Sequence, residues 1–157
     1  PEVKLVIAPH VIDENHLVEI IRKLKRPYVR YTRADEKNVR KADCLIIDCF
    51  GLLSSIYRYG EIAYIGGGFG VGIHNTLEAA VYGIPVIFGP KYQKFQEAIQ
   101  LLEAKGAFSV KDYEELKTLL DRMLTDEVFL RESGMNASNY VTGNAGATDK
   151  IMSMINF

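Results

Sequence analysis

The chain has 157 residues, 48% of them hydrophobic and 25% charged, and its 19 lysines and arginines nearly balance its 20 aspartates and glutamates. This composition excludes a disordered chain, and the balanced charge argues against a nucleic-acid binder, which needs a basic surface. Uncharged apolar stretches are too short to cross a bilayer, which takes about 20 residues. Because the chain starts at Pro1, close to its first apolar run and without a secretory signal, we expect a piece of a longer protein.

Short apolar runs alternate with amphipathic stretches along the whole chain. The apolar runs predict strands over residues 5–8, 29–31, 44–47, 62–65, 86–88 and 108–110. The amphipathic stretches predict helices over residues 15–24, 52–59, 76–82, 95–105 and 112–124. Two or three more helices are expected after Asp126, the last over 147–155.

This alternation predicts the fold class. Continuously apolar strands are typical of a sheet covered on both faces, and strand–helix alternation is typical of parallel βαβ units. We therefore expect one α/β domain over residues 1–157, with a Rossmann-like, doubly wound parallel sheet. Ligands of such sheets bind at the carboxyl ends of the strands, which points to residues 9–15, 48–55, 66–75 and 89–95.

The two cysteines, Cys44 and Cys49, flank one apolar run. Two thiols make no disulfide framework, and without a second Cys-x-x-Cys or a nearby pair of histidines a zinc site is a poor interpretation. We expect both to be ordinary thiols near the core.

The densest signal is a glycine-rich stretch between a predicted strand and a predicted helix. Residues 66–72 contain five glycines in seven positions. Glycines let a ligand approach the backbone closely, and the start of the next helix offers free N–H groups and the positive end of its dipole. We interpret the stretch as an anion site, most often one for phosphate. The alternative is a glycine-rich turn that binds nothing.

Two common nucleotide-binding motifs do not fit this stretch. The dinucleotide motif Gly-x-Gly-x-x-Gly fails in every register, because its third glycine falls on Val71, Ile73 or Asn75. The phosphate-binding P-loop fails because no Gly-Lys-Ser/Thr follows. A nicotinamide dehydrogenase is therefore disfavoured.

Polar residues begin the helix predicted after the glycines. In a local interpretation, Asn75 caps the helix and Glu78 reaches back in a capping box. In a functional one, Glu78 accepts hydrogen bonds from ribose hydroxyls while His74 and the helix N–H groups meet a phosphate. Spacing alone leaves both open. Lys91 and Lys94, after the next strand, would face the same rim, although lysines in loops are usually only solvated.

Several motifs together resemble the C-terminal half of bacterial 3-deoxy-D-manno-octulosonic acid (Kdo) transferases. The resemblance runs from about Val6 to the C-terminal helices and rests on residues 48–53, 56–57, 62–69, 72–80, 83–90 and 95–98, with His-Asn-x-Leu-Glu at its centre. The chain departs from the family pattern at three positions. Thr76 stands where many relatives have Pro, Ile73 where many have Gly, and Lys94 where some have Asn.

The resemblance implies one half of a GT-B glycosyltransferase, in which two Rossmann-like domains face each other across a cleft. The C-terminal domain binds CMP-Kdo; the N-terminal domain receives a lipid A precursor and supplies the catalytic carboxylate. On this basis the chain would be the donor-binding domain, soluble, inactive alone and without a catalytic residue of its own. The whole enzyme would work in lipopolysaccharide core assembly at the cytoplasmic face of the bacterial inner membrane, held by an N-terminal anchor.

The resemblance also implies roles for individual residues. The glycine loop and the N–H groups near Asn75 would meet the phosphate, Glu78 the ribose, and Gly51 and Leu52 the cytosine, while His10 occupies a position where a basic residue near the donor is expected. The expected donor-binding residues are thus His10, Gly51, Leu52, Gly66, Gly67, Gly68, His74, Asn75 and Glu78. No cofactor is expected, and no metal is required, because only one phosphate leaves and no cluster of aspartates is present.

Two other functions stay open at this point. One is another enzyme of the same two-domain plan, such as a UDP-sugar transferase or an epimerase. The other is a non-catalytic nucleotide-binding or scaffold domain. The preference for CMP over UDP and UDP-sugars would separate the first from a Kdo transferase, and Kdo transfer by the complete enzyme would exclude the second.

Overall fold

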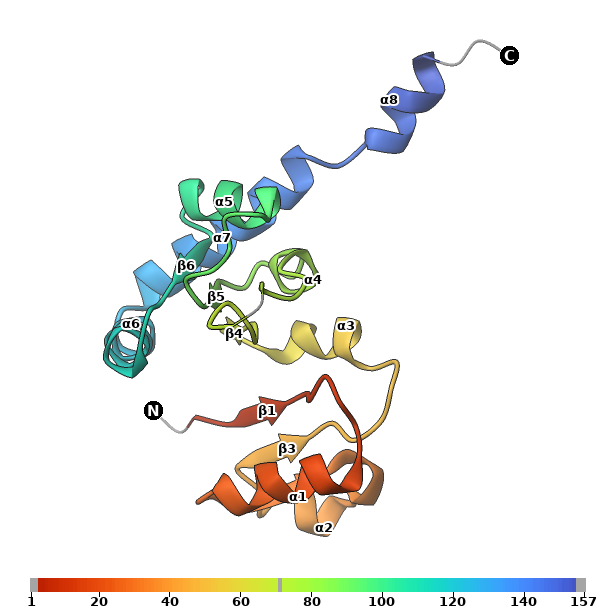
Figure 1. Cartoon of the computed structure of the whole chain (residues 1–157), viewed down its shortest axis with the longest axis vertical. Helices are drawn as coiled ribbons and strands as arrows, with labels where there is room; N and C mark the ends of the chain where they lie inside the picture. The colour runs from red at the N-terminus through yellow and green to blue at the C-terminus, as the bar shows by residue number, and fades with distance from the viewer. Residues whose placement is uncertain (1–2, 71, 155–157) are drawn as a thin grey trace. The chain divides into compact units, whose positions relative to one another are not determined.

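The computed structural model describes residues 3–70 and 72–154 and divides the chain into two compact units, Pro1–Ile56 and Tyr57–Phe157. We call these the N-terminal and the C-terminal unit. Each contains a three-stranded parallel sheet with helices beside it (Figure 1). The α/β class with parallel strands is therefore confirmed, although the described strands form two sheets where one was expected. That the whole chain is a single domain stays a prediction.

The sheet of the N-terminal unit has the strand order β1-β3-β2. Its register pairs Ile7 of β1 and Arg30 of β2 with Ile46 of β3, so all three strands end at one edge. The elements of this unit are β1 (Leu5–Ile7), α1 (Glu14–Lys23), β2 (Tyr28–Arg30), η1 (Tyr31–Arg33), α2 (Glu36–Val39), β3 (Cys44–Ile46) and α3 (Leu53–Ile56).

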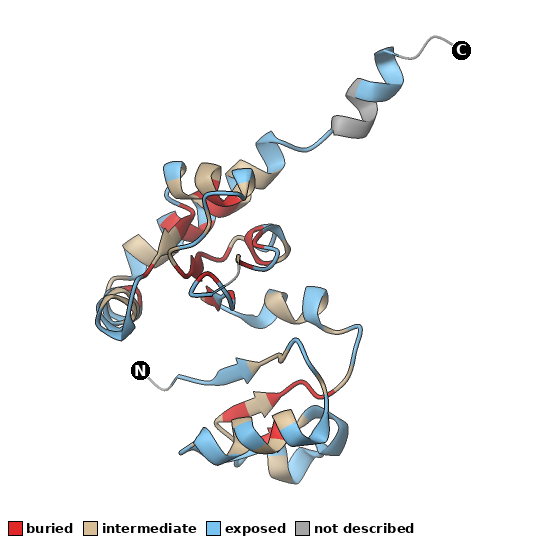
Figure 2. Cartoon of the chain, in the orientation of Figure 1, coloured by how far each residue is buried: buried red, intermediate tan, exposed pale blue. Residues whose placement is uncertain are grey.

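Helix α1 covers this sheet with the apolar stripe that the sequence predicted. Asp13 caps the helix by accepting the N–H of His16 at 3.0 Å. Leu17, Cys44 and Ile46 form the buried cluster beneath it. The edge strand β1 differs from expectation, because Leu5 and Val6 are 39% and 47% exposed (Figure 2). Of the three strands described in this sheet, the central strand β3 has hydrogen-bonded neighbours on both sides, and β1 has one neighbour.

The sheet of the C-terminal unit has the strand order β4-β5-β6. The elements of this unit are η2 (Tyr57–Tyr59), β4 (Ala63–Tyr64), α4 (Leu77–Ala80), β5 (Val86–Phe88), α5 (Gln96–Glu103), β6 (Ala107–Ser109), α6 (Tyr113–Thr125), α7 (Glu127–Gly143) and α8 (Ala147–Met154). The predicted end of the last helix, Ile155, lies outside the described residues.

The central strand β5 forms the middle of this unit's core, and all three of its side chains are fully buried (Figure 2). The long helix α7 packs against α4, α5 and α6, and so joins the helices of the unit (Figure 1). Two buried clusters result, one centred on Val86 and Phe88 and the other on Ile87 and Met123. Within residues 3–70 and 72–154, none of the helices combines the length and apolar character needed to span a bilayer.

Three local predictions differ from the structure. The helix predicted over 76–82 is only the four residues of α4. Helix α2 was not predicted, although Asp35 and Asn38 form a complete capping box at its start. The helix predicted over 95–105 is the shorter α5, and Lys105 beyond its end takes the left-handed conformation, with φ of 60°. Gly106 provides room for Ala137, because a Cβ on Gly106 would lie 2.6 Å from the backbone of Ala137.

Candidate functional site

The glycine loop connects β4 to α4 and folds back on itself. The carbonyl of Gly66 accepts the N–H of His74 at 3.4 Å, and the N–H of Gly68 reaches the carbonyl of Gly72 at 3.3 Å. An isolated antiparallel bridge joins Gly67 to Ile73 between these two bonds. The two arms of the loop therefore lie against each other. The predicted loop also includes Val71, which lies outside the described residues.

Packing requires three of the five glycines. Gly67 and Gly68 have φ of 96° and 81°, a conformation that side chains disfavour. A Cβ on Gly68 would lie 2.8 Å from Gly89, so the loop touches the end of β5 backbone to backbone. A Cβ on Gly72 would collide with the Phe95 ring.

The other two glycines, Gly66 and Gly70, are exposed, and a Cβ on either would meet nothing within 4 Å. Both have room for a side chain, yet the sequence has none there. Packing thus explains part of the glycine content, and an open backbone surface remains. Such a surface is what a ligand that approaches the main chain needs.

The start of α4 differs from the predicted capping box. Thr76 occupies the N-cap position without a side-chain capping bond, and its buried hydroxyl has no hydrogen-bond partner among the described residues. Asn75 instead accepts the N–H of Leu77 at 3.0 Å and donates its amide to the carboxylate of Glu78, also at 3.0 Å. The local interpretation is correct in pairing Asn75 with Glu78, but the bond runs between their side chains.

Glu78 is half-buried and is held through one carboxylate oxygen, Oε1. Tyr57 is half-buried against the core of the same unit, and it lies close enough to Glu78 to interact with its charge. Burial raises the pKa of the Tyr57 phenol, and the negative charge of Glu78 raises it further. A protonated phenol thus stands near a carboxylate that Asn75 orients. Tyr57 was not among the predicted site residues, although it lies in a segment of the resemblance.

The loop after β5 also reaches the glycine loop. The N–H of Lys91 donates to the carbonyl of Gly68 at 2.9 Å, and its ammonium donates to the carbonyl of Gly70 at 3.2 Å. The expectation that a lysine of this loop faces the glycine rim is therefore confirmed for Lys91.

The other predicted donor-binding residues lie in the N-terminal unit. His10 follows β1 and is exposed; Gly51, with φ of 87°, and Leu52 follow β3 at the same sheet edge. The carbonyl of Leu52 already accepts the N–H groups of Ser55 and Ile56, at 3.1 and 3.0 Å. A backbone contact from Leu52 to a base would therefore use its N–H group. The ligand-binding role of all these residues stays a prediction.

A buried carboxylate at this edge was missed by the sequence analysis. Asp48 accepts the hydroxyl and N–H of Thr32 at 2.6 and 2.9 Å and the Nε of Arg30 at 2.7 Å, and Arg30 also binds Glu14 at 2.8 Å. Burial alone would raise the pKa of Asp48, but the hydrogen bonds from Thr32 and Arg30 outweigh it and lower the pKa to about 2. The sequence feature that could have indicated this site is an aspartate directly after an apolar strand.

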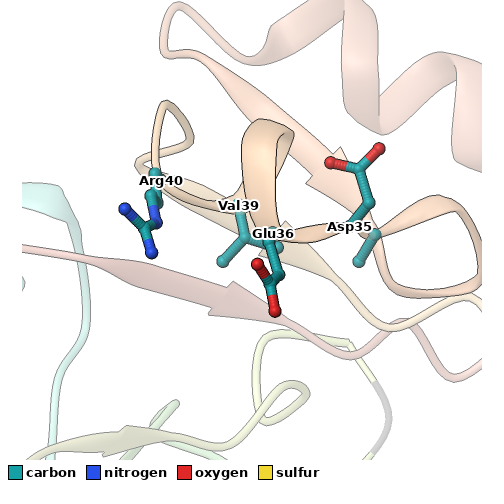
Figure 3. A pocket seen from close by; sticks show the side chains of 5 residues that line it. Asp35, Glu36, Val39 and Arg40 are labelled. Carbon is teal, nitrogen blue, oxygen red and sulfur yellow. The ribbon is translucent and has the colours of Figure 1, made fainter.

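Two shallow hollows lie elsewhere. One is lined by residues of α2 and its ends, and Figure 3 shows Val39 there together with the acidic Asp35 and Glu36 and the basic Arg40. The other lies between β6 and α6. None of the predicted donor-binding residues lines either hollow. Within the part of the chain that the structure describes, no group of three or more His, Cys, Asp or Glu side chains could hold a metal ion.

Known proteins similar to this chain include much longer ones. No protein-family model matches. The chain is 37% identical over 124 residues to a protein of Aquifex aeolicus named 3-deoxy-D-manno-octulosonic acid transferase, which covers 78% of this chain and 34% of that protein. It is 30% identical over 148 residues to a Fusobacterium nucleatum protein named bifunctional glycosyltransferase/methyltransferase, covering 87% of this chain and 23% of that protein. The chain thus spans about a third of its Aquifex relative and less of the other.

A solved structure shares the fold. It is described as the C-terminal CMP-Kdo binding domain of WaaA from Acinetobacter baumannii, and it aligns with a TM-score of 0.74 at 19% identity, over 88% of this chain and 73% of that one. At this identity the likeness shows the fold alone, whereas the sequence matches show descent. The resemblance to Kdo transferases that the sequence motifs indicated is thereby confirmed: over 78% of its length, the chain is similar to a protein of that name.

Proposed function

We propose that these residues form the donor-binding domain of a glycosyltransferase that moves Kdo from CMP-Kdo to a lipid A precursor, in lipopolysaccharide core biosynthesis. The observation that carries this proposal is the 37% identity to the Aquifex Kdo transferase over 78% of the chain. The open backbone at Gly66 and Gly70, beside the oriented carboxylate of Glu78, supports it from geometry.

The chemistry assigns the loop to the leaving group. As the bond between Kdo and the CMP phosphate breaks, negative charge grows on the phosphate, and N–H groups on the open side of the loop would stabilise it. The Glu78 oxygen that Asn75 does not hold would accept the ribose hydroxyls. Helix α4 would contribute less than the sequence predicted, because it has four residues and Asn75 already occupies the N–H of Leu77.

The remainder of such an enzyme would complete the site. In this proposal, an N-terminal domain outside these residues binds the lipid acceptor and supplies the catalytic base. The acceptor would be a membrane lipid, and we propose that the enzyme acts at the cytoplasmic face of the bacterial inner membrane. The isolated chain would then bind the nucleotide weakly and transfer nothing, because it supplies one wall of the cleft.

Titration of the 157-residue chain with CMP and UMP, followed by amide NMR, tests the proposal. We expect the amides of residues 66–78 to shift with CMP, and UMP to bind more weakly. Glu78→Ala should weaken CMP binding about tenfold, which corresponds to the loss of a charged hydrogen bond worth about 1.4 kcal/mol.

The control for this experiment is Glu103→Ala, which removes an exposed carboxylate from α5 and should leave binding unchanged. If the amides of residues 66–78 do not move at saturating CMP, the assigned site is wrong. A preference for UMP or UDP-sugars would favour a different nucleotide-sugar enzyme instead.

A further inference from the structure

Two hydrogen bonds hold Lys91 against the glycine loop, one from its main chain and one from its ammonium group. Its main-chain N–H binds the carbonyl of Gly68 at 2.9 Å and its Nζ binds the carbonyl of Gly70 at 3.2 Å. The side chain therefore lies along the loop. Gly70 itself has no atom within 4 Å of its Cβ position, so the ammonium stands beside accessible backbone.

The ammonium group of Lys91 is suited to bind an anion. An ammonium has three N–H donors, and the carbonyl of Gly70 uses one, which leaves two for an incoming acceptor. The residue is exposed, so a ligand can reach it without opening the fold. Backbone N–H groups supply directional donors but no net charge, whereas a lysine adds a full positive charge as a compact point.

We propose that Lys91 is a specificity-determining residue of the donor site, where it binds the phosphate of the cytidylate and so discriminates nucleotide from nucleoside. This inference rests on the proposed function, since it takes the glycine loop as the phosphate site. Lys94 lies on the same loop with the same charge, but it has no hydrogen bond to the glycine loop among the described residues. Lys91 therefore differs from Lys94 in its contact to the glycine loop and not in its charge.

The test compares CMP with cytidine, which lacks the phosphate, by NMR titration of the 157-residue chain and its variants. Lys91→Met should weaken CMP binding about tenfold and leave cytidine binding unchanged, because only a charged contact to phosphate is lost. Lys91→Arg should keep most of the preference for CMP. Lys94→Met is the matched control and should bind both ligands as the unmodified chain does. The main-chain bond from residue 91 to Gly68 survives every substitution, and thermal unfolding checks that the fold does too.

The outcomes separate this inference from the proposed function. If Lys91→Met binds CMP as tightly as the unmodified chain, the phosphate contact is refuted while the donor site stands. Equal losses for CMP and cytidine would mean that Lys91 only shapes the loop, which also refutes it. If the unmodified chain binds neither ligand at residues 66–78, the proposed function is refuted, and the role of Lys91 is refuted with it.

Discussion

Asp48 is a buried carboxylate with three hydrogen bonds at the carboxyl edge of the N-terminal sheet. Its side chain is 1% exposed, and its partners Thr32 and Arg30 come from the neighbouring strand β2 and the turn after it. Hydrogen bonds of this kind stabilise the charged carboxylate over the neutral acid. Asp48 thus ties the segment after β2 to the segment after β3, and the second of these continues into Gly51 and Leu52.

The low pKa of Asp48 predicts acid sensitivity. Its folded-state value of about 2 lies below the ordinary 3.8, so the stabilisation is complete above about pH 4 and is lost as the pH falls toward 2. A difference of this size corresponds to about 2 kcal/mol. Urea unfolding of the chain over that range should show the loss. Asp48→Asn should be less stable at neutral pH by a similar amount, with a flatter acid profile.

The control is Asp121→Asn. Asp121 forms an exposed ion pair with Lys117 on α6, and such pairs contribute little. We expect this substitution to change stability by less than about 0.5 kcal/mol and to keep the acid transition. An Asp48→Asn variant with the same acid profile as the unmodified chain would contradict the role given to Asp48.

At this scale the sequence predicted residue types better than contacts. The pairing of Asn75 with Glu78 was anticipated, because three-residue spacing at a helix start brings the two together. Its form was not, since Thr76 occupies the N-cap position. The hydrogen bonds of Asp48 join it to residues that lie 16 and 18 positions away along the chain, and a local sequence pattern cannot predict contacts over such separations.

Among the elements, helix α7 depends on a glycine that local helix propensity would disfavour. Gly134 lies inside α7, where alanine is normally better by about 1 kcal/mol. A Cβ at this position would lie far inside the contact distance of the Gly83 carbonyl oxygen. Gly83 has φ of 71° and belongs to the turn after α4, so the obstacle is backbone and cannot rotate away.

Gly134→Ala should therefore destabilise the chain by about 1–3 kcal/mol, the usual cost of overpacking a close contact. Gly143→Ala is the matched control in the same helix, because nothing lies within 4 Å of its Cβ position. That variant should be as stable as the unmodified chain or slightly more so. Thermal unfolding of the two variants side by side measures the difference. Equal melting temperatures would show that α7 does not approach Gly83 as closely as described.

Long apolar periodicity predicted elements well, and short signals predicted them poorly. The stripe of Leu17, Ile20 and Ile21 placed α1 within one residue of its observed start and end, and the acidic cap Asp112 placed α6. Helix α2 was missed because it has four residues and no apolar stripe. The burial of β1 was overestimated, since an apolar run reports that a strand can be covered, not what covers it.

At the scale of the whole molecule, the buried apolar side chains are divided unequally. Among the described residues, the C-terminal unit contains two hydrophobic clusters, one of which has twelve buried residues. The cluster described in the N-terminal unit has three, and strand β1 of that unit leaves Leu5 and Val6 exposed. Sequence patterns do not report this imbalance, because apolar runs of similar length occur in both units. A chain of about 56 residues is near the lower limit for a stable core.

This imbalance predicts that the two units differ in autonomy. Residues 57–157, expressed alone, should unfold cooperatively on heating and give a dispersed amide spectrum, because both of their clusters are built from their own residues. Residues 1–56 alone should show no cooperative transition, since the five apolar side chains buried among the described residues of this piece offset little of the entropy lost on folding. Circular dichroism and NMR of the two pieces measure this directly. If 57–157 is unfolded alone while the full chain is folded, the units depend on each other, and the sequence-based prediction of one domain over residues 1–157 is the better description.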